Sequence, residues 1–112
     1  SLAGAKKLLD AVTGLSGSGP AYIFLVAEAM IDAGVMTGLS RTVSTDLAIQ
    51  TLVGASTLLA EGKPPAELRA DVTSPGGTTA AGLRELESHG LRAAFAAAIE
   101  AASRRSQELG QN

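Results

Sequence analysis

The sequence predicts an all-α fold, and two observations indicate it. Alanine and leucine dominate, while valine and isoleucine are scattered, so no segment shows the period-two pattern of a half-buried strand. Clusters of glycine and proline divide the chain into pieces of helical length. The chain has 112 residues and no cysteine, so we expect one domain, residues 1–112, whose core needs no disulfide.

The first helix is expected over residues 3–12, and it should end before the glycine-rich stretch 14–19. Ser18 is expected to cap a second helix, because Pro20 lacks an N–H and is tolerated in a first helical turn. This helix should run to residue 35. Its apolar residues cover most of its circumference, and Glu28 and Asp32 form its one charged stripe.

A third helix is expected over residues 42–60, after Ser40, with no charge between Asp46 and Glu61. Two long helices that are apolar nearly all round exceed what one small core covers. We therefore expect an obligate oligomer, and a two-fold dimer because that symmetry is the commonest. The alternative is a monomer in which the remaining helices cover the apolar surfaces of both long helices.

The remaining segments follow from prolines and glycines. Residues 61–65 form a break, and a short helix starts at Pro65 and covers residues 65–69. A turn rich in hydroxyls and glycine, residues 71–79, leads into a helix that ends at His89 and Gly90. The last helix, residues 91–109, is rich in alanine, so it can pack closely against its neighbours.

Charge and hydropathy exclude several classes of protein. Nine basic and eleven acidic residues give a net charge of −2 without a basic stripe, so no nucleic-acid or membrane partner is expected. The longest uncharged stretch, residues 11–27, is broken by three glycines and Pro20, so the chain is interpreted as soluble. Lys6 and Lys7 follow small residues, the reverse of a secretory leader, and a cytoplasmic location is expected.

Most catalytic and cofactor motifs are missing. His89 is the only histidine, so no metal site and no serine–histidine–aspartate triad are expected, and His89 is interpreted as a helix C-terminal residue. Gly14 and Gly19 have phosphate-loop spacing, but Pro20 and Ala21 stand where lysine and a hydroxyl residue are needed. No third glycine completes a dinucleotide fingerprint.

Two glycine- and hydroxyl-rich turns remain, and each opens a helix. A helix N-terminus presents free N–H groups and a positive dipole end, so either turn could hold a carboxylate. The second turn is chemically richer, since Gly76 and Gly77 allow close approach and Thr78 and Thr79 add hydroxyls. From the residues alone, ordinary capping by Ser74 or Thr78 is favoured over a binding site.

Two long motifs carry a resemblance to a known family. The first is DAVTGLSGSGPAY from Asp10, and the second is DVTSPGGTT from Asp71, followed by GLxxLE from Gly82. In this order, about fifty residues apart, they resemble the C-terminal domain of pyrroline-5-carboxylate reductase, and the similarity extends over residues 6–107.

The resemblance implies a fold and an activity. The fold is a helical bundle that interlocks with a second copy, as in the 6-phosphogluconate dehydrogenase C-terminal-like fold. The family reduces 1-pyrroline-5-carboxylate to L-proline with NADPH or NADH, the last step of proline synthesis. Its members form homodimers that can assemble into decamers. An N-terminal Rossmann domain, absent from this chain, binds the nicotinamide cofactor, so the chain alone should bind no cofactor and be inactive.

The resemblance also implies roles for residues. The substrate carboxylate would bind Ser74 and the N–H groups of Gly76, Gly77, Thr78 and Thr79, and the Thr79 hydroxyl would be catalytic, orienting or protonating the imine nitrogen. The turn that would face the cofactor domain consists of Ser16, Gly17, Ser18, Gly19 and Pro20. The alternative function is a helical self-association module, isolated or engineered, with no catalytic activity of its own.

Overall fold

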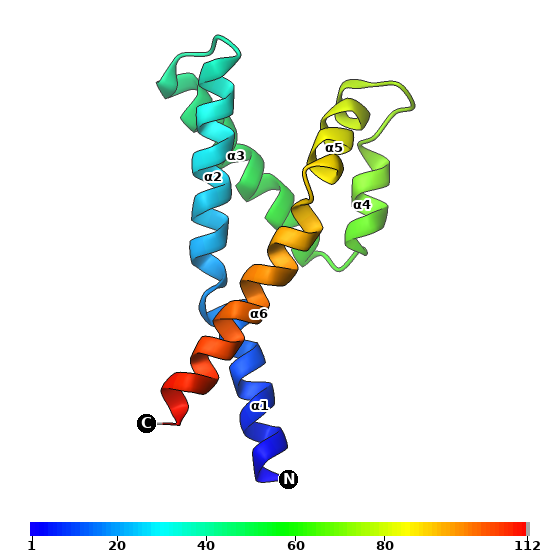
Figure 1. Ribbon diagram of the computed structural model, residues 1–112. Coiled ribbons are helices and arrows are strands. Elements are labelled where there is room, and N and C mark those ends of the chain that lie inside the picture. The colour runs from blue at the N-terminus through cyan, green and yellow to red at the C-terminus, as the bar shows by residue number, and fades with distance from the viewer. Residues whose placement is uncertain (112) are drawn as a thin grey trace. The chain divides into compact units, whose positions relative to one another are not determined.

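A computed structural model describes residues 1–111 of the chain, and their regular structure is entirely helical. The helices are α1 (Leu2–Val12), α2 (Gly19–Met36), α3 (Arg41–Ala60), α4 (Pro65–Asp71), α5 (Thr78–Ser88) and α6 (Leu91–Gly110), with a π-helical segment, Thr13–Gly17, between α1 and α2 (Figure 1). The all-α prediction is therefore confirmed. Asn112, the last residue of the predicted domain 1–112, lies outside the described residues.

Local signals set most helix boundaries where they were expected. The Ser40 side chain accepts a hydrogen bond from the Val43 N–H at 3.2 Å and caps α3. Pro65 occupies the first position of α4, where its missing N–H has no helical partner. Gly90 has φ +76°, the left-handed conformation typical of the residue that follows a helix, and it separates α5 from α6.

The first α-helix ends at Val12, as expected, but the glycine-rich stretch after it is helical as well, which was not expected. The chain continues through this stretch as a π-helix, in which the Ser18 N–H bonds to the Thr13 carbonyl five residues earlier at 2.8 Å. Ser18 is not an N-cap, because its φ of −85° and ψ of −17° are helical, whereas a cap residue is extended.

The chain folds as two compact units. The first consists of the described residues 1–23 and 86–111, in which α1, the π-helical segment and α6 pack together. A hydrogen bond of 2.7 Å from the Ser106 hydroxyl to the Asp10 carboxylate joins α6 to α1. At the start of α6, the Arg92 Nε donates to both Glu87 carboxylate oxygens at 3.0 Å, and this pair raises the pKa of Arg92.

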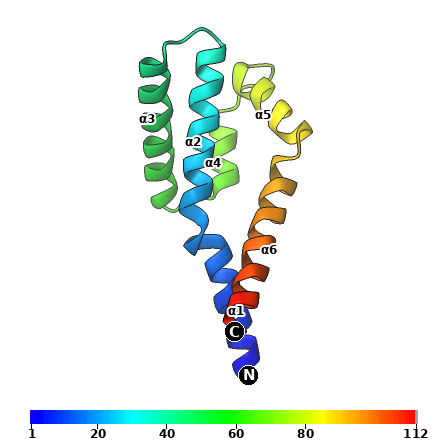
Figure 2. The ribbon, with the colours of Figure 1, turned by 60° about the vertical axis from the view of Figure 1, so that its left-hand side comes forward.

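The second unit, residues 24–85, contains α2 from Phe24 onward, which is antiparallel to α3 (Figure 2), and the short helix α4, which packs on α3. Ser44 is 3% exposed, and its hydroxyl donates to the Ile31 carbonyl at 2.8 Å, so this bond joins α3 to α2. An ion pair between Lys63 and Asp71 connects the loop before α4 to the end of that helix.

Very little apolar surface is buried. Ala48, 7% exposed, is the only buried hydrophobic residue among those that the structure describes. Large apolar side chains lie in the open along α2 and α3, among them Ile23, Phe24, Leu25, Leu47, Ile49 and Val53. A core this small cannot offset the entropy lost on folding, so these faces require a covering surface.

Two helical stretches are long and apolar enough to cross a membrane by length and composition, Leu2–Met36 and Arg41–Ala60. The first includes the glycines and Pro20 that were expected to break a span. Helices that bury their apolar faces against protein satisfy the same criterion.

Candidate functional site

The predicted carboxylate site is a tight turn directly before α5. The Gly77 N–H donates to the Ser74 carbonyl at 3.0 Å, which closes a four-residue turn with Pro75 and Gly76 at its centre. Proline followed by a residue of positive φ is typical of a type II turn, and Gly76 has φ +68°. The Pro–Gly pair therefore determines the local path of the chain.

The turn delivers the backbone into the N-terminus of α5. The first α-helical hydrogen bond of α5 runs from the Ala81 N–H to the Gly77 carbonyl at 3.2 Å. The N–H groups of Thr78, Thr79 and Ala80 come before this bond, in the first turn, where N–H groups have no partner of the α-helical pattern. These groups lie at the positive end of the helix dipole, where an anion is stabilised. Gly77 differs from them, because its N–H already closes the turn.

The predicted site residues combine exposed and half-buried positions. Ser74, Gly76 and Thr78 are exposed, whereas Gly77 and Thr79 are half-buried. A Cβ atom at Gly77 would lie 3.2 Å from the Ser74 carbonyl oxygen, so the turn is tight against its own backbone. The arrangement can offer N–H groups and hydroxyls to a small carboxylate.

The residue just before this turn is held by hydrogen bonds to the end of α4. The Thr73 hydroxyl donates to the Arg69 carbonyl at 2.5 Å, and the Thr73 N–H donates to the Ala70 carbonyl at 3.1 Å. Both bonds attach the residue before Ser74 to the end of α4. The turn is thus supported by hydrogen bonds on the side of α4 and by the start of α5.

The second predicted group, residues 16–20, belongs to the other compact unit. The Ser16 hydroxyl donates to the Val12 carbonyl at 3.0 Å and is used inside the helix, while Gly19 and Pro20 begin α2. Beside this group lies a mostly apolar hollow of about 370 Å³, lined by Leu15, Ser16, Gly19, Pro20, Tyr22, Ile23, Phe95 and Ile99. The structure therefore brings the predicted residues Ser74–Thr79 together at one turn. The predicted residues 16–20 lie together in a separate segment.

Sequence reasoning missed two residues that shape the second group. Gly14 is buried, and a Cβ atom there would lie 2.7 Å from the Ile99 carbonyl oxygen and 3.0 Å from the Ser103 nitrogen of α6. Tyr22 donates from its hydroxyl to the Gly14 carbonyl at 3.3 Å. Gly14 itself was the available signal, because a glycine can mark the close approach of another backbone.

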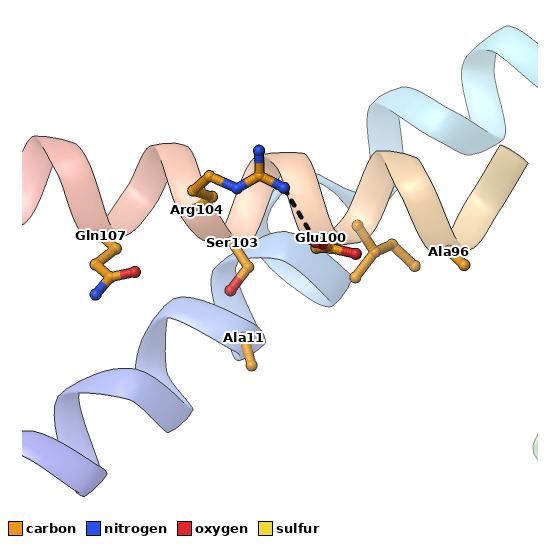
Figure 3. A pocket seen from close by; sticks show the side chains of 7 residues that line it. Ala11, Ala96, Glu100, Ser103, Arg104 and Gln107 are labelled. Carbon is orange, nitrogen blue, oxygen red and sulfur yellow. Dashed lines mark hydrogen bonds and ion pairs between the residues drawn. The ribbon is translucent and has the colours of Figure 1, made fainter.

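Figure 3 shows a hollow where α6 crosses α1. There α6 passes over α1, and Ala11 and Ser103 lie in the gap between the two helices. The labelled ion pair joins Arg104 to Glu100 on α6 at 3.0 Å. Small side chains at the crossing let the helices approach each other closely.

The described residues contain no cluster of side chains that could bind a metal ion. No group of three or more histidine, cysteine, aspartate or glutamate residues within this part of the chain is placed to hold a metal ion. His89 follows the end of α5, and its Nδ1 lies 3.3 Å from the Ser88 hydroxyl.

Comparison with known proteins identifies the fold. Residues 6–109 match the family model described as pyrroline-5-carboxylate reductase dimerisation. The chain is 56% identical over 108 residues to a pyrroline-5-carboxylate reductase of Arabidopsis thaliana and 54% identical over 105 residues to one of Corynebacterium melassecola. These alignments cover 96% and 93% of this chain but 39% of each relative, so the chain spans about two-fifths of their length.

Solved structures give the same result. A pyrroline-5-carboxylate reductase from Coxiella burnetii superposes with a TM-score of 0.89 at 42% identity, over 92% of this chain and 38% of that one. Pyrroline carboxylate reductase of Plasmodium falciparum, solved with NADP bound, superposes with a TM-score of 0.88 at 41% identity, over 93% and 40%.

A dimerisation family also explains the exposed apolar faces of α2 and α3, because a second copy can cover them. The expected homo-oligomer is therefore supported by both the family and the surface. The chain belongs to the pyrroline-5-carboxylate reductase family and is its C-terminal dimerisation domain.

Proposed function

We propose that this chain is the substrate-binding and dimerising part of an enzyme that reduces 1-pyrroline-5-carboxylate to L-proline. The observation that carries the proposal is the turn at Ser74–Gly77, which leads into the N-terminus of α5 with glycine and hydroxyl residues on one short segment. The substrate is an anion with one carboxylate, which matches the charge preference of a helix N-terminus.

The proposed chemistry adds a hydride to the carbon and a proton to the nitrogen of a C=N bond. The Ser74 hydroxyl and the N–H groups of Gly76, Thr78 and Thr79 bind the carboxylate and orient the ring, while the Gly77 N–H closes the turn. A nicotinamide, NADPH or NADH, when bound by a domain outside this chain, would supply the hydride to the ring carbon and would itself be oxidised. The Thr79 hydroxyl lies beside the imine nitrogen, which gains the proton, and orients or protonates it.

The nicotinamide is assigned to a domain outside this chain, because the relatives are more than twice as long. Within the chain, Ser16, Gly17, Ser18, Gly19 and Pro20 form the segment that faces that domain. The working protein is a homodimer, with a decamer as a higher assembly, and it acts in the cytoplasm.

The test joins this chain to a nicotinamide-binding domain of the family and measures reduction of 1-pyrroline-5-carboxylate. Thr79→Ala should lower kcat by about ten- to a thousandfold with little change in KM, because an oriented hydroxyl is lost at the reacting nitrogen. Thr79→Ser should restore most of the activity, and Thr57→Val, which removes an exposed hydroxyl from α3, should leave it unchanged. An inactive wild-type fusion contradicts the proposed function, and an unchanged Thr79→Ala rate contradicts the role of Thr79.

The second candidate is a module that only self-associates, and the exposed apolar side chains of α2 and α3 favour it. Titration of the chain with L-proline, followed by amide NMR, separates the two functions. Shifts at Gly76, Gly77 and Thr79 support a preformed carboxylate site. A dimer without such shifts leaves self-association alone.

A further inference from the structure

In the π-helical segment Thr13–Gly17, the backbone hydrogen bond spans five residues instead of the four that it spans in the α-helices on either side. Pro20 has no N–H to donate to a carbonyl of the preceding turn, so the ordinary α-helical bonding pattern is interrupted just after this segment. The register of the segment therefore depends on contacts from outside its own backbone. π-helical insertions of this kind are frequent at functional sites.

Two side-chain contacts of Tyr22 reach this segment and α6. The Tyr22 hydroxyl donates to the Gly14 carbonyl, eight residues earlier, at 3.3 Å. Its ring meets Phe95 edge-on, with ring centroids 6.4 Å apart and an interplanar angle of 80°. Both Tyr22 and Phe95 are half-buried. Tyr22 is thus attached to the π-helical segment at one end and to α6 along its ring.

Gly14 also contacts α6 directly, through its backbone. Its missing side chain lets the backbone of α6 approach at Ile99, one helical turn after Phe95. The Gly14 carbonyl receives Tyr22 while its Cα faces α6, so the position is held on two sides. The next residues but one are Ser16, Gly17 and Ser18, so their positions depend on the helical register at Gly14.

We propose that Tyr22 is a positioning residue that fixes the register of the π-helical segment and thereby presents residues 16–20 to the nicotinamide-binding domain. The inference rests on the proposed function. It assigns Tyr22 no contact with the substrate, and its effect is transmitted through Gly14.

The experiment uses Tyr22→Phe, which keeps the ring against Phe95 and removes only the hydroxyl. In the fusion with a nicotinamide-binding domain, KM for the nicotinamide should rise about two- to tenfold, the effect of one lost hydrogen bond. KM for 1-pyrroline-5-carboxylate and the dimer dissociation constant should not change. In the 112-residue chain alone, amide hydrogen exchange at Gly17 and Ser18 should become faster by a similar factor.

A matched control is Thr37→Val, which also removes one hydroxyl bond to a backbone carbonyl, that of Gly34 at 2.8 Å. It should change neither KM nor the exchange at Gly17 and Ser18. A Tyr22→Phe variant with unchanged exchange and unchanged nicotinamide KM overturns the inference. So does one in which both KM values and dimerisation worsen together, since that pattern indicates a general structural role.

The exchange measurement keeps the two proposals separable. If the wild-type fusion is inactive, the proposed function fails, while the exchange at Gly17 and Ser18 still reports whether Tyr22 holds the register. If the wild-type fusion is active and Tyr22→Phe behaves as the wild type in both assays, only the positioning role fails.

Discussion

Gly14 is a residue at which the backbone of the π-helical segment closely approaches the backbone of α6. A side chain there would meet backbone atoms of Ile99 and Ser103, which cannot rotate away as a flexible side chain would. At Gly17, in the same segment, an added Cβ would contact only the Thr13 side chain, its methyl carbon at 3.6 Å and its Cβ at 3.9 Å. Two glycines three residues apart therefore have different structural roles.

This difference predicts opposite results for two alanine substitutions. Gly14→Ala should lower the free energy of unfolding by about 1–3 kcal/mol, because overpacking forces the two helices apart. Gly17→Ala should be neutral or stabilise the chain by up to about 1 kcal/mol, since alanine is the better helix former. Urea unfolding followed by circular dichroism, at one protein concentration, measures both. Equal effects of the two variants would contradict the assigned contact.

Gly76 needs glycine for its backbone conformation rather than for space. Its φ of +68° is left-handed, yet no atom lies within 4 Å of a Cβ built there. Gly76→Ala should cost about 1–2 kcal/mol of stability and weaken L-proline binding, because the turn before α5 is distorted.

The control for Gly76 is Gly82→Ala within α5, where the space is also open and the backbone is helical. Gly82→Ala should retain proline binding and stabilise the helix slightly. Amide NMR titrations of the two variants compare their affinities. Equal proline affinities would show that the turn conformation does not matter for binding.

At the scale of elements, the pair α2 and α3 is joined by a close contact between Gly34 and Ser44. A Cβ atom at Gly34 would lie 2.1 Å from the Ser44 hydroxyl oxygen, which is bonded to the Ile31 carbonyl. Small residues at both positions let the two helices approach each other. The boundaries of both helices were predictable from Ser40 and the flanking glycines, but this contact required the pairing of the helices.

A double-mutant cycle tests the contact. Gly34→Ala alone should destabilise the chain by about 1–3 kcal/mol, and Ser44→Ala alone by about 1 kcal/mol through the lost hydrogen bond. In the double variant the alanine methyl gains room where the hydroxyl was, so the loss should be smaller than the sum by more than about 0.5 kcal/mol. Thermal or urea unfolding gives the three values. Strict additivity would contradict direct contact.

At the scale of the whole molecule, the exposed apolar side chains determine the behaviour of the chain. Phe24 and Leu25 of α2 are 67% and 64% exposed, and a single copy buries almost no hydrophobic side chain in the described part. Folding and association are therefore coupled, so the stability of the chain should rise with its concentration.

Phe24→Asp should weaken the dimer by at least about tenfold, because burial of a phenylalanine side chain contributes about 1.5–3 kcal/mol and a buried aspartate is penalised. Sedimentation equilibrium over a dilution series measures the dissociation constant. Glu67→Lys, a charge change in the first turn of the short helix α4, serves as the control. A wild-type chain that stays a stable monomer at micromolar concentration would contradict the coupling.

The sequence by itself determined the helical class, the order and approximate ends of the helices, the carboxylate-binding candidate at Ser74–Thr79 and the need for a partner surface. These features depend on local chemistry, such as the Pro–Gly turn and the Ser40 cap, or on an excess of apolar residues that no small core can bury. Only the tertiary structure decided that residues 13–17 are π-helical. That conformation depends on the approach of α6 at Gly14 and on the Tyr22 hydroxyl, and contacts between residues far apart in the chain cannot be derived from local propensity.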